Sequence, residues 1–215
     1  LVKFQIEDQP VVDIWCIDLL KKINNHFKTN LISSKKFQQY CTFDIDNAYA
    51  FKNKGILRYT GSFLKDLFLL RGFKLRQRFN VFFRIKNDPY DNYHYLNQFL
   101  NTHKLKAIFF FLLGDYGKMD KNINPNHPNF IKLIQSLSKF HSIGIHPSYG
   151  SLNSKKIIKK EIDNLKKINS KEVELSRFHY LRFSFPKSYQ ILQSLGVQKD
   201  FSMGYTDRIG FRAGT

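Results

Sequence analysis

Apolar residues recur at helical spacing in six stretches of the chain. The first stretch spans residues 11–27 and is amphipathic. Its apolar face carries Ile14, Ile17, Leu20 and Ile23. The remaining stretches predict helices over 64–70, 89–100, 130–140, 154–168 and 186–195. Gly196 follows the last of these directly, which is typical of a helix C-terminus. Residues 28–40 are polar and basic and predict a linker.

Short apolar segments between these helices predict strands. They span 40–43, 107–113, 143–145 and 178–183. The second is continuously apolar rather than alternating, which is typical of a parallel strand buried on both faces. Strands that alternate with helices indicate βαβ units and a parallel sheet, so the sequence predicts an α/β fold. In such folds the chemistry lies at the C-terminal ends of the strands.

The amino-acid composition predicts a packed core and gives the chain a strong positive charge. Hydrophobic residues make up 42% of the 215 residues, with 22 Phe and 11 Tyr, which is enough for a core rich in ring packing. The formal charge of +18 would suit nucleic acid, an anionic membrane or an acidic polymer. However, the lysines are scattered and accompany abundant Asn, Ile, Phe and Tyr, as in AT-rich genomes. Because no zinc finger, RRM or helix-turn-helix signature appears, we expect no nucleic-acid partner and keep such binding as a lesser alternative.

The cysteines and the chain ends give weak indications of location. Cys16 and Cys41 form no disulfide or metal pattern, which favours a reducing compartment, and we expect a cytoplasmic protein. No signal peptide and no apolar stretch near 18 residues is visible, so no membrane span is expected. The first residue is Leu1 and the last is Thr215, and we expect the chain to be cut at both ends.

Polar residues at two strand ends form the main candidate site. Asp44 and Asp46 alternate on an extended segment and can face the same side. His146 ends another predicted strand, and parallel strand ends can converge on one pocket. Asp and His suit a divalent metal such as zinc, and a second carboxylate can act as general base in hydrolysis. The structural alternatives are a cap or turn for each acid and a hydrogen-bonded core position for the histidine.

Three segments in order resemble the motifs of one enzyme family. Thr42-Phe-Asp-Ile-Asp46 resembles the first motif of the polysaccharide deacetylase (NodB-homology) family, carbohydrate esterase family four. His141-Ser-Ile-Gly-Ile-His-Pro-Ser-Tyr149 resembles the second motif, and Arg182-Phe-Ser-Phe-Pro186 the third. Segments 195–197, 200–205 and 210–215 are similar to a bacterial branch of the family, and 9–15 resembles the end of its upstream domain.

This resemblance implies a fold and a domain division. It implies a deformed (β/α) barrel over residues 41–215, incomplete because its C-terminal strands are missing. Residues 1–40 would be the end of an upstream domain plus a linker. The implied activity is metal-dependent hydrolysis that removes acetyl groups, by N- or O-deacetylation, from a carbohydrate or polysaccharide. The oligomeric state stays open.

The resemblance also implies roles for individual residues. Asp44 would be the general base, and Arg182 would orient it through an ion pair. Asp46 and His146 would bind the divalent metal, expected to be zinc, which activates the attacking water and stabilises the oxyanion. Tyr149 and Pro186 are candidates for contact with the sugar.

The chain departs from the family pattern in ways that leave alternatives open. The acids are separated by Ile45, whereas the usual motif has adjacent acids. Gly150 occupies the position of the usual second histidine, although catalytic zinc normally has three protein ligands. His179 is a candidate replacement or else a hydrogen-bonded strand histidine, and His141 is expected to be structural. The general-acid histidine would lie beyond Thr215. A catalytically impaired relative that binds glycan without turnover is therefore the alternative function.

The remaining polar and aromatic candidates have structural interpretations. Tyr205 is expected either in the sugar cleft or in packing, and Arg212 in a structural ion pair. Asp115 and Asp120 follow the strand predicted at 107–113 and are expected in a solvated loop, with contact to the substrate as the alternative.

Overall fold

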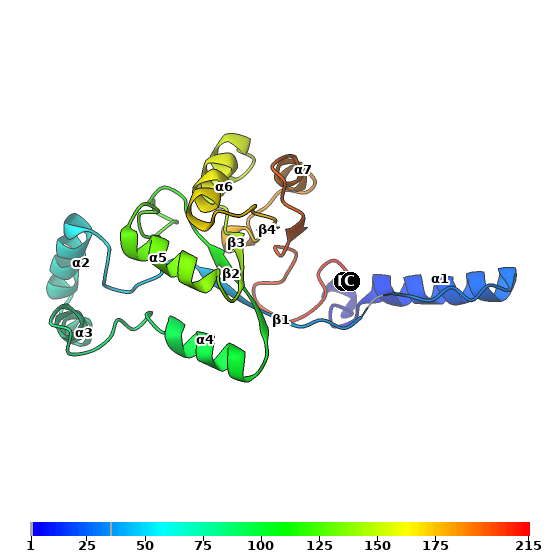
Figure 1. Cartoon of the computed structure of the whole chain (residues 1–215), viewed down its shortest axis with the longest axis horizontal. Helices are drawn as coiled ribbons and strands as arrows, with labels where there is room; N and C mark the ends of the chain where they lie inside the picture. The colour runs from blue at the N-terminus through cyan, green and yellow to red at the C-terminus, as the bar shows by residue number, and fades with distance from the viewer. Residues whose placement is uncertain (1, 35) are drawn as a thin grey trace.

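An open, curled sheet of five parallel strands forms the centre of the computed structural model, which describes residues 2–34 and 36–215 (Figure 1). The strands are β1 (Tyr40–Ile45), β2 (Lys106–Phe111), β3 (Ser142–Ile145), β4 (Leu175–Ser176) and β5 (Lys199–Asp200). Their spatial order is β1-β2-β3-β4-β5, and every neighbouring pair is parallel. The predicted α/β class with a parallel sheet is confirmed. Because the strand order never reverses, each connection advances the sheet in one direction, as in one half of a barrel.

The helices mostly lie where the apolar period places them. They are α1 (Val11–Phe27), α2 (Ile56–Phe68), α3 (Gly72–Phe82), α4 (Tyr93–Thr102), α5 (Pro128–Leu137), α6 (Lys155–Asn169) and α7 (Lys187–Ser194). Three short 3-10 helices are η1 (Val2–Phe4), η2 (Tyr149–Ser151) and η3 (His179–Leu181). The predicted helix over 11–27 is confirmed to the residue. The predicted helix over 154–168 is confirmed within one residue, with the Ser154 hydroxyl accepting from the Ile157 N–H as its N-cap.

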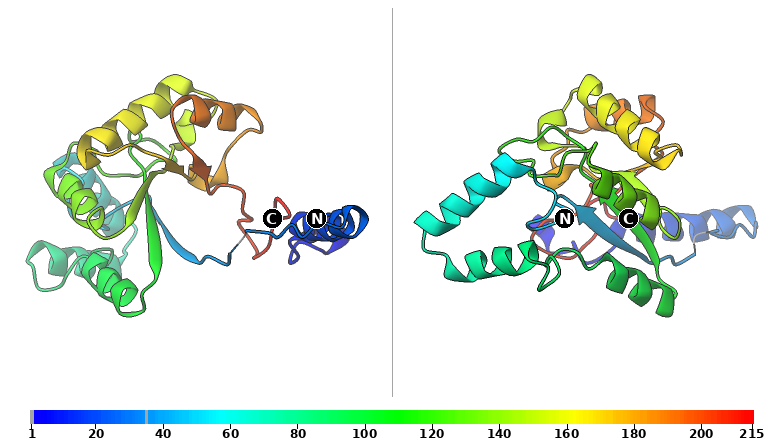
Figure 2. Two further views of the ribbon diagram at one scale, coloured as in Figure 1. Left: turned by 45° about the vertical axis from the view of Figure 1, so that its right-hand side comes forward. Right: turned by 60° about the vertical axis from the view of Figure 1, so that its left-hand side comes forward.

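The core lies between the sheet and the helices α5 and α6. Strand β2 is its centre, since the three phenylalanines of residues 109–111 have no exposed surface. Figure 2 shows α4, α5 and α6 around the sheet. Gly144 in β3 is required by this packing, because a Cβ there would lie 2.6 Å from the Phe110 ring and 2.9 Å from the Leu175 carbonyl oxygen.

One predicted strand is wrong. Residues 178–183 do not join the sheet, whose fourth strand ends at Ser176, two residues earlier. The Phe178 N–H donates to the Ser202 Oγ and the His179 N–H to the Pro147 carbonyl, so neither takes part in a strand ladder. The chain instead forms the short turn η3, inside which Tyr180 has a left-handed backbone with φ of 58°. Apolar residues gave this segment the appearance of a strand.

The apolar pattern missed two boundaries and two elements. The predicted helix over 64–70 is the end of α2, which begins at Ile56. The predicted strand over 107–113 ends two residues earlier, although its last two residues stay buried. Helix α3 was not predicted, and neither was β5, whose two residues Lys199 and Asp200 carry no apolar signal.

Helix α1 extends away from the sheet, as Figure 1 shows, and Val11 is its one buried residue. The residues around the start of α1 pack against the last residues of the chain. The Val12 N–H donates to the Gly214 carbonyl, and the Phe211 N–H to the Glu7 carbonyl. The division at residue 40 stays a prediction. Among the described residues, no helix combines the length and apolar character needed to cross a bilayer.

Candidate metal centre

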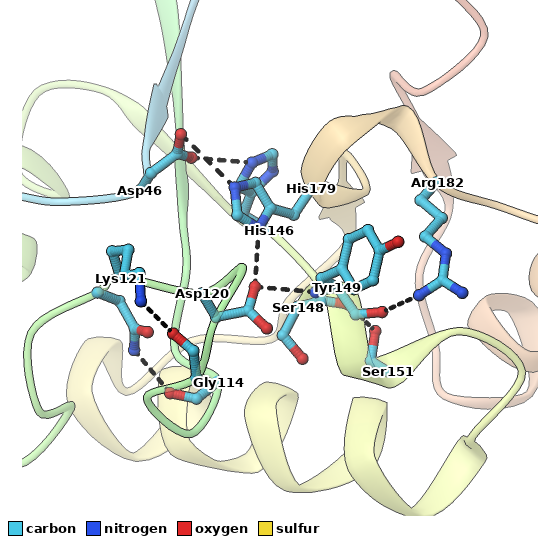
Figure 3. A network of polar contacts seen from close by, with 12 residues as sticks. Asp46, Gly114, Asp120, Lys121, His146, Ser148, Tyr149, Ser151, His179 and Arg182 are labelled. Atoms are coloured by element: carbon cyan, nitrogen blue, oxygen red, sulfur yellow. Dashed lines mark hydrogen bonds and ion pairs between the residues drawn. The ribbon is translucent and has the colours of Figure 1, made fainter.

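Three side chains converge at the C-terminal edge of the sheet. Asp46 follows β1, His146 follows β3, and His179 lies three residues beyond β4. One ligand atom from each lies within 4.8 Å of the other two. His146 Nε2 is 3.1 Å from Asp46 Oδ1, and His179 Nε2 is 3.6 Å from Asp46 Oδ2 (Figure 3). The structure thus brings together the three residues that the sequence offered as metal ligands.

The hydrogen bond that each histidine makes through Nδ1 determines the protonation of Nε2, the nitrogen that faces Asp46. His146 Nδ1 is 2.5 Å from the Arg177 carbonyl oxygen, which can only accept, so Nδ1 carries a proton. His179 Nδ1 is 2.8 Å from Asp120 Oδ1, a carboxylate oxygen. In a neutral imidazole, Nε2 is then an acceptor, and two such nitrogens face an acceptor carboxylate. A cation resolves this repulsion, either as a proton on each ring or as a metal ion between them.

The geometry fits a metal ion. Zinc binds nitrogen and oxygen at about 2.0–2.2 Å, so neighbouring ligands of a tetrahedral ion lie about 3.3–3.6 Å apart. The two separations from Asp46, 3.1 and 3.6 Å, lie within about 0.2 Å of this range. Hydrogen bonding of Nδ1 to a carbonyl or carboxylate is also the usual way in which a metal-binding histidine is oriented. The donor set and its supporting contacts therefore suit a divalent cation.

Charge and burial are distributed unevenly over the three ligands. The side chains of His146 and His179 are 2% and 6% exposed, whereas that of Asp46 is 52% exposed. Hydrogen bonds from His146 and then His179 hold the pKa of Asp46 far below its usual range. Burial acts to lower the pKa of His179, but its hydrogen bonds to Asp46 and Asp120 outweigh burial and raise it. These contacts favour an ionised Asp46 beside a readily protonated His179.

Asp120 supports the site, which the sequence interpretation missed. We expected a solvated loop, and this is wrong for Asp120, which is 7% exposed. Its Oδ1 accepts from the Tyr149 N–H at 2.9 Å as well as from His179. Asp115, by contrast, has an exposed side chain paired with Lys160. The loop follows β2 at the same sheet edge as the other candidates, and this position was the available signal.

The general-base candidate is held by a different arginine from the one expected. Arg177 Nη1 donates to Asp44 Oδ1 at 3.1 Å. Arg182, expected in this role, donates to the Tyr149 carbonyl at 2.7 Å and lies 4.0 Å from the centre of the Tyr149 ring. The expected Arg182–Asp44 ion pair is therefore corrected to Arg177–Asp44. The reason is that Arg177 directly follows β4, while η3 carries Arg182 towards Tyr149.

The other candidates surround the three ligands or lie away from them. Tyr149 is half-buried between Arg182 and the ring of Tyr180. Pro186 is exposed and forms the N-cap of α7. Gly150 is exposed in η2, and its position has open space for a side chain. His141, at the opposite end of β3, contacts the Asn97 side chain and the Phe109 ring, in line with the structural role expected for it.

A buried carboxyl group lies behind the loop that carries His146. Glu161 of α6 is 1% exposed, and its Oε2 accepts from the Ser148 N–H at 3.1 Å. Its Oε1 is buried without a hydrogen-bond partner among the described residues. Burial raises the pKa of Glu161 to about 7. The carboxyl group thus connects α6 to the site loop, and neutral pH is where it changes charge.

Comparison with known proteins gives a distant structural likeness. No family model and no curated protein matches the sequence. Among solved structures, a provisionally named polysaccharide deacetylase from Mycobacterium smegmatis is similar, with 14% identity and a TM-score of 0.49. The match covers 82% of this chain and 55% of that one, so the chain spans about half the length of this neighbour. A likeness this distant assigns neither a family nor an activity.

Proposed function

We propose that this chain binds a divalent metal, zinc in the first instance, at Asp46, His146 and His179 and removes acetyl groups from a carbohydrate. The observation that carries the proposal is the orientation of the two histidines. Each directs Nδ1 to an acceptor and Nε2 to the same carboxylate, an arrangement that suits a cation better than a simple hydrogen-bonded core. The exposure of Asp46 leaves one side of the site open to a substrate.

The residues divide the hydrolysis between them. A bound divalent ion supplies polarisation of the acetyl carbonyl and favours deprotonation of water. Asp44 accepts the water proton at a carboxylate oxygen, and Arg177 holds that carboxylate in place. Water adds to the acetyl carbon, and the bond to the sugar nitrogen or oxygen breaks, releasing acetate and a free amine or hydroxyl. The departing nitrogen or oxygen gains one proton, equivalent to the one that Asp44 takes from water, so the water is divided between acetate and the free amine or hydroxyl.

The carbohydrate class and the barrel rest on the motif resemblance. We propose residues 41–215 as an incomplete deformed (β/α) barrel and residues 1–40 as the end of an upstream domain. Tyr149, whose ring contacts Arg182 and Tyr180 beside the ligand loop, is kept as a candidate for contact with the sugar. Pro186 is kept as a second candidate for this contact.

The impaired, glycan-binding alternative rested on Gly150 in place of a ligand. His179 offers a third ligand from a different loop, which removes the reason to expect a site with only two. We therefore favour a working metal site. Nucleic-acid binding rests on charge alone, and absence of any salt-sensitive binding to nucleic acid would exclude it.

Metal content and acetate release test the proposal separately. The purified chain, loaded with zinc and dialysed, should retain about one equivalent by elemental analysis. His146→Ala and His179→Ala should lose the metal, whereas His141→Ala, at the other end of β3, should keep it. Asp44→Asn should keep the metal and lose about 100-fold or more of the acetate release from N- and O-acetylated oligosaccharides. A metal-loaded wild-type chain that releases no acetate from any of these substrates would contradict the proposed activity.

A further inference from the structure

The helical hairpin formed by α2, α3 and the residues after them, 56–86, carries an unusual outer surface. In Figure 1 it projects from the side of the molecule opposite α1. At its tip, Phe68 is 88%, Leu70 87% and Phe73 76% exposed. The other exposed apolar side chains are Ile56, Leu57, Phe63, Leu64, Leu67, Leu69, Phe79, Phe82, Phe83 and Ile85. A concentration of exposed apolar side chains on one part of a protein surface marks an interaction site.

The interior of the hairpin has the opposite polarity. Asp66 and Arg78 are buried at 4% and 8% exposure, and Arg78 Nε donates to Asp66 Oδ2 at 2.8 Å. Arg71 adds a second contact to Asp66 at 3.5 Å. Val81 is the one apolar residue buried in α2 or α3. A hairpin that places an ion pair inside and phenylalanines outside is suited to an apolar medium outside.

The charges on the hairpin are almost all positive. Residues 56–86 contain one acidic residue, Asp66, which the arginines already neutralise. The basic residues are Arg58, Lys65, Arg71, Lys74, Arg76, Arg78, Arg84 and Lys86. At the base of the hairpin, a cavity of about 820 Å³ is lined by Lys54, Arg84 and Lys86 together with Tyr59 and Phe82. No acidic side chain lines this cavity, which suits an anionic group such as a phosphate.

We propose that the 56–86 hairpin docks on an anionic lipid surface. The apolar tip enters the boundary between head groups and acyl chains, and the surrounding lysines and arginines contact the lipid phosphates. Charge complementarity favours lipid over a protein partner. The hairpin combines exposed apolar side chains with almost exclusively positive charges, and an anionic bilayer combines an apolar interior with negative head groups. This surface is separate from the metal centre, so the inference does not depend on the proposed function.

Vesicle flotation of the full chain tests the docking. The wild type should bind vesicles of phosphatidylglycerol mixed with phosphatidylcholine, and should bind pure phosphatidylcholine far more weakly. A tip variant, Phe68→Ser with Leu70→Ser and Phe73→Ser, should bind at least about 100-fold more weakly, because three apolar side chains no longer enter the bilayer. The matched control replaces Trp15, Leu19 and Phe27 of α1, which are also 58–67% exposed, by Ser and should bind as the wild type does.

A charge variant keeps the test decisive if the tip variant fails to fold. Lys65→Gln, Arg76→Gln and Arg84→Gln remove exposed charges, and each should weaken binding about fivefold, or about 100-fold together. Equal binding to neutral and anionic vesicles would overturn the proposal, as would unchanged binding by both variants. The proposal would also be overturned if the wild type did not bind vesicles and light scattering showed a dimer that the tip variant cannot form. That result would show that a second copy of the chain covers the hairpin.

Discussion

Replacement of Asp120 tests whether the two histidines are built to hold a metal. Asp120 Oδ1 accepts from His179 Nδ1 at 2.8 Å and from the Tyr149 N–H at 2.9 Å. Asp120→Asn keeps an acceptor oxygen but removes the negative charge that orients and polarises the imidazole. Such supporting partners are worth about 10–100-fold in metal affinity, or about 1.4–2.7 kcal/mol. We therefore expect about tenfold weaker zinc binding for Asp120→Asn.

Asp120→Ala should be the more severe change. It removes both accepted hydrogen bonds and leaves the Tyr149 N–H without its acceptor beside a buried loop. Zinc binding should weaken about 100-fold, and the free energy of unfolding should fall by about 1–3 kcal/mol. The difference between the Asn and Ala variants separates the loss of charge from the loss of the hydrogen bonds.

Competition with a chromophoric zinc chelator measures these affinities directly. The matched control is Asp115→Asn in the same loop, because Asp115 is exposed and pairs only weakly with Lys160. This control should change zinc affinity by less than about fivefold. If Asp120→Asn and Asp120→Ala bind zinc as tightly as the wild type, or if the Asp115 control weakens it equally, His179 is not a supported metal ligand.

Further predictions concern the base, a buried carboxyl group and a packed glycine. Arg177→Gln should reduce acetate release at least about tenfold without reducing zinc content, since it removes the partner of Asp44 but keeps the backbone carbonyl that orients His146. The pKa of Glu161 is raised from 4.5 to about 7, so its burial favours folding below about pH 4.5, and this advantage is lost as pH rises through about 7. Urea titrations should therefore show that the wild type loses about 3 kcal/mol more stability than Glu161→Gln between about pH 5 and pH 8, and equal pH dependence would contradict this. Gly144→Ala should cost about 1–3 kcal/mol through its clash with a ring and a carbonyl, with Gly150→Ala in open space as the neutral control.

The strand-end rule explains how much of the site the sequence could reveal. Asp44 lies near the end of β1, and Asp46 and His146 directly follow β1 and β3, so their positions depend on local pattern and parallel pairing. The same pattern predicted the sheet and most helices. Helix α3 was not predicted, and three of its phenylalanines, Phe73, Phe79 and Phe82, are exposed rather than packed in the core.

The rest of the site depends on contacts that no local pattern encodes. His179 reaches Asp46 only because the chain leaves the sheet after Ser176 and turns at Tyr180 through a left-handed backbone. That turn is stabilised from distant parts of the chain, through the Pro147 carbonyl and the Ser202 hydroxyl. Residues 177 and 182 are both arginines, and the same turn determines which of them can form the ion pair with Asp44.

The net charge of the three proposed ligands and of the Asp44–Arg177 pair explains why one acid and two histidines would suit hydrolysis. Among the three ligands, Asp46 contributes one negative charge and two neutral histidines contribute none, so a divalent ion and these ligands together would carry one net positive charge, with the Asp120 carboxylate behind His179. The neighbouring Asp44 does not cancel that charge, because Arg177 already balances it at 3.1 Å. A positive centre beside a neutralised carboxylate can polarise an uncharged acetyl carbonyl while Asp44 still accepts a proton. Exchanging His179 for an acid would remove this residual charge, so a His179→Asp variant should keep metal but lose acetate release, and retained activity with full metal content would refute this electrostatic argument.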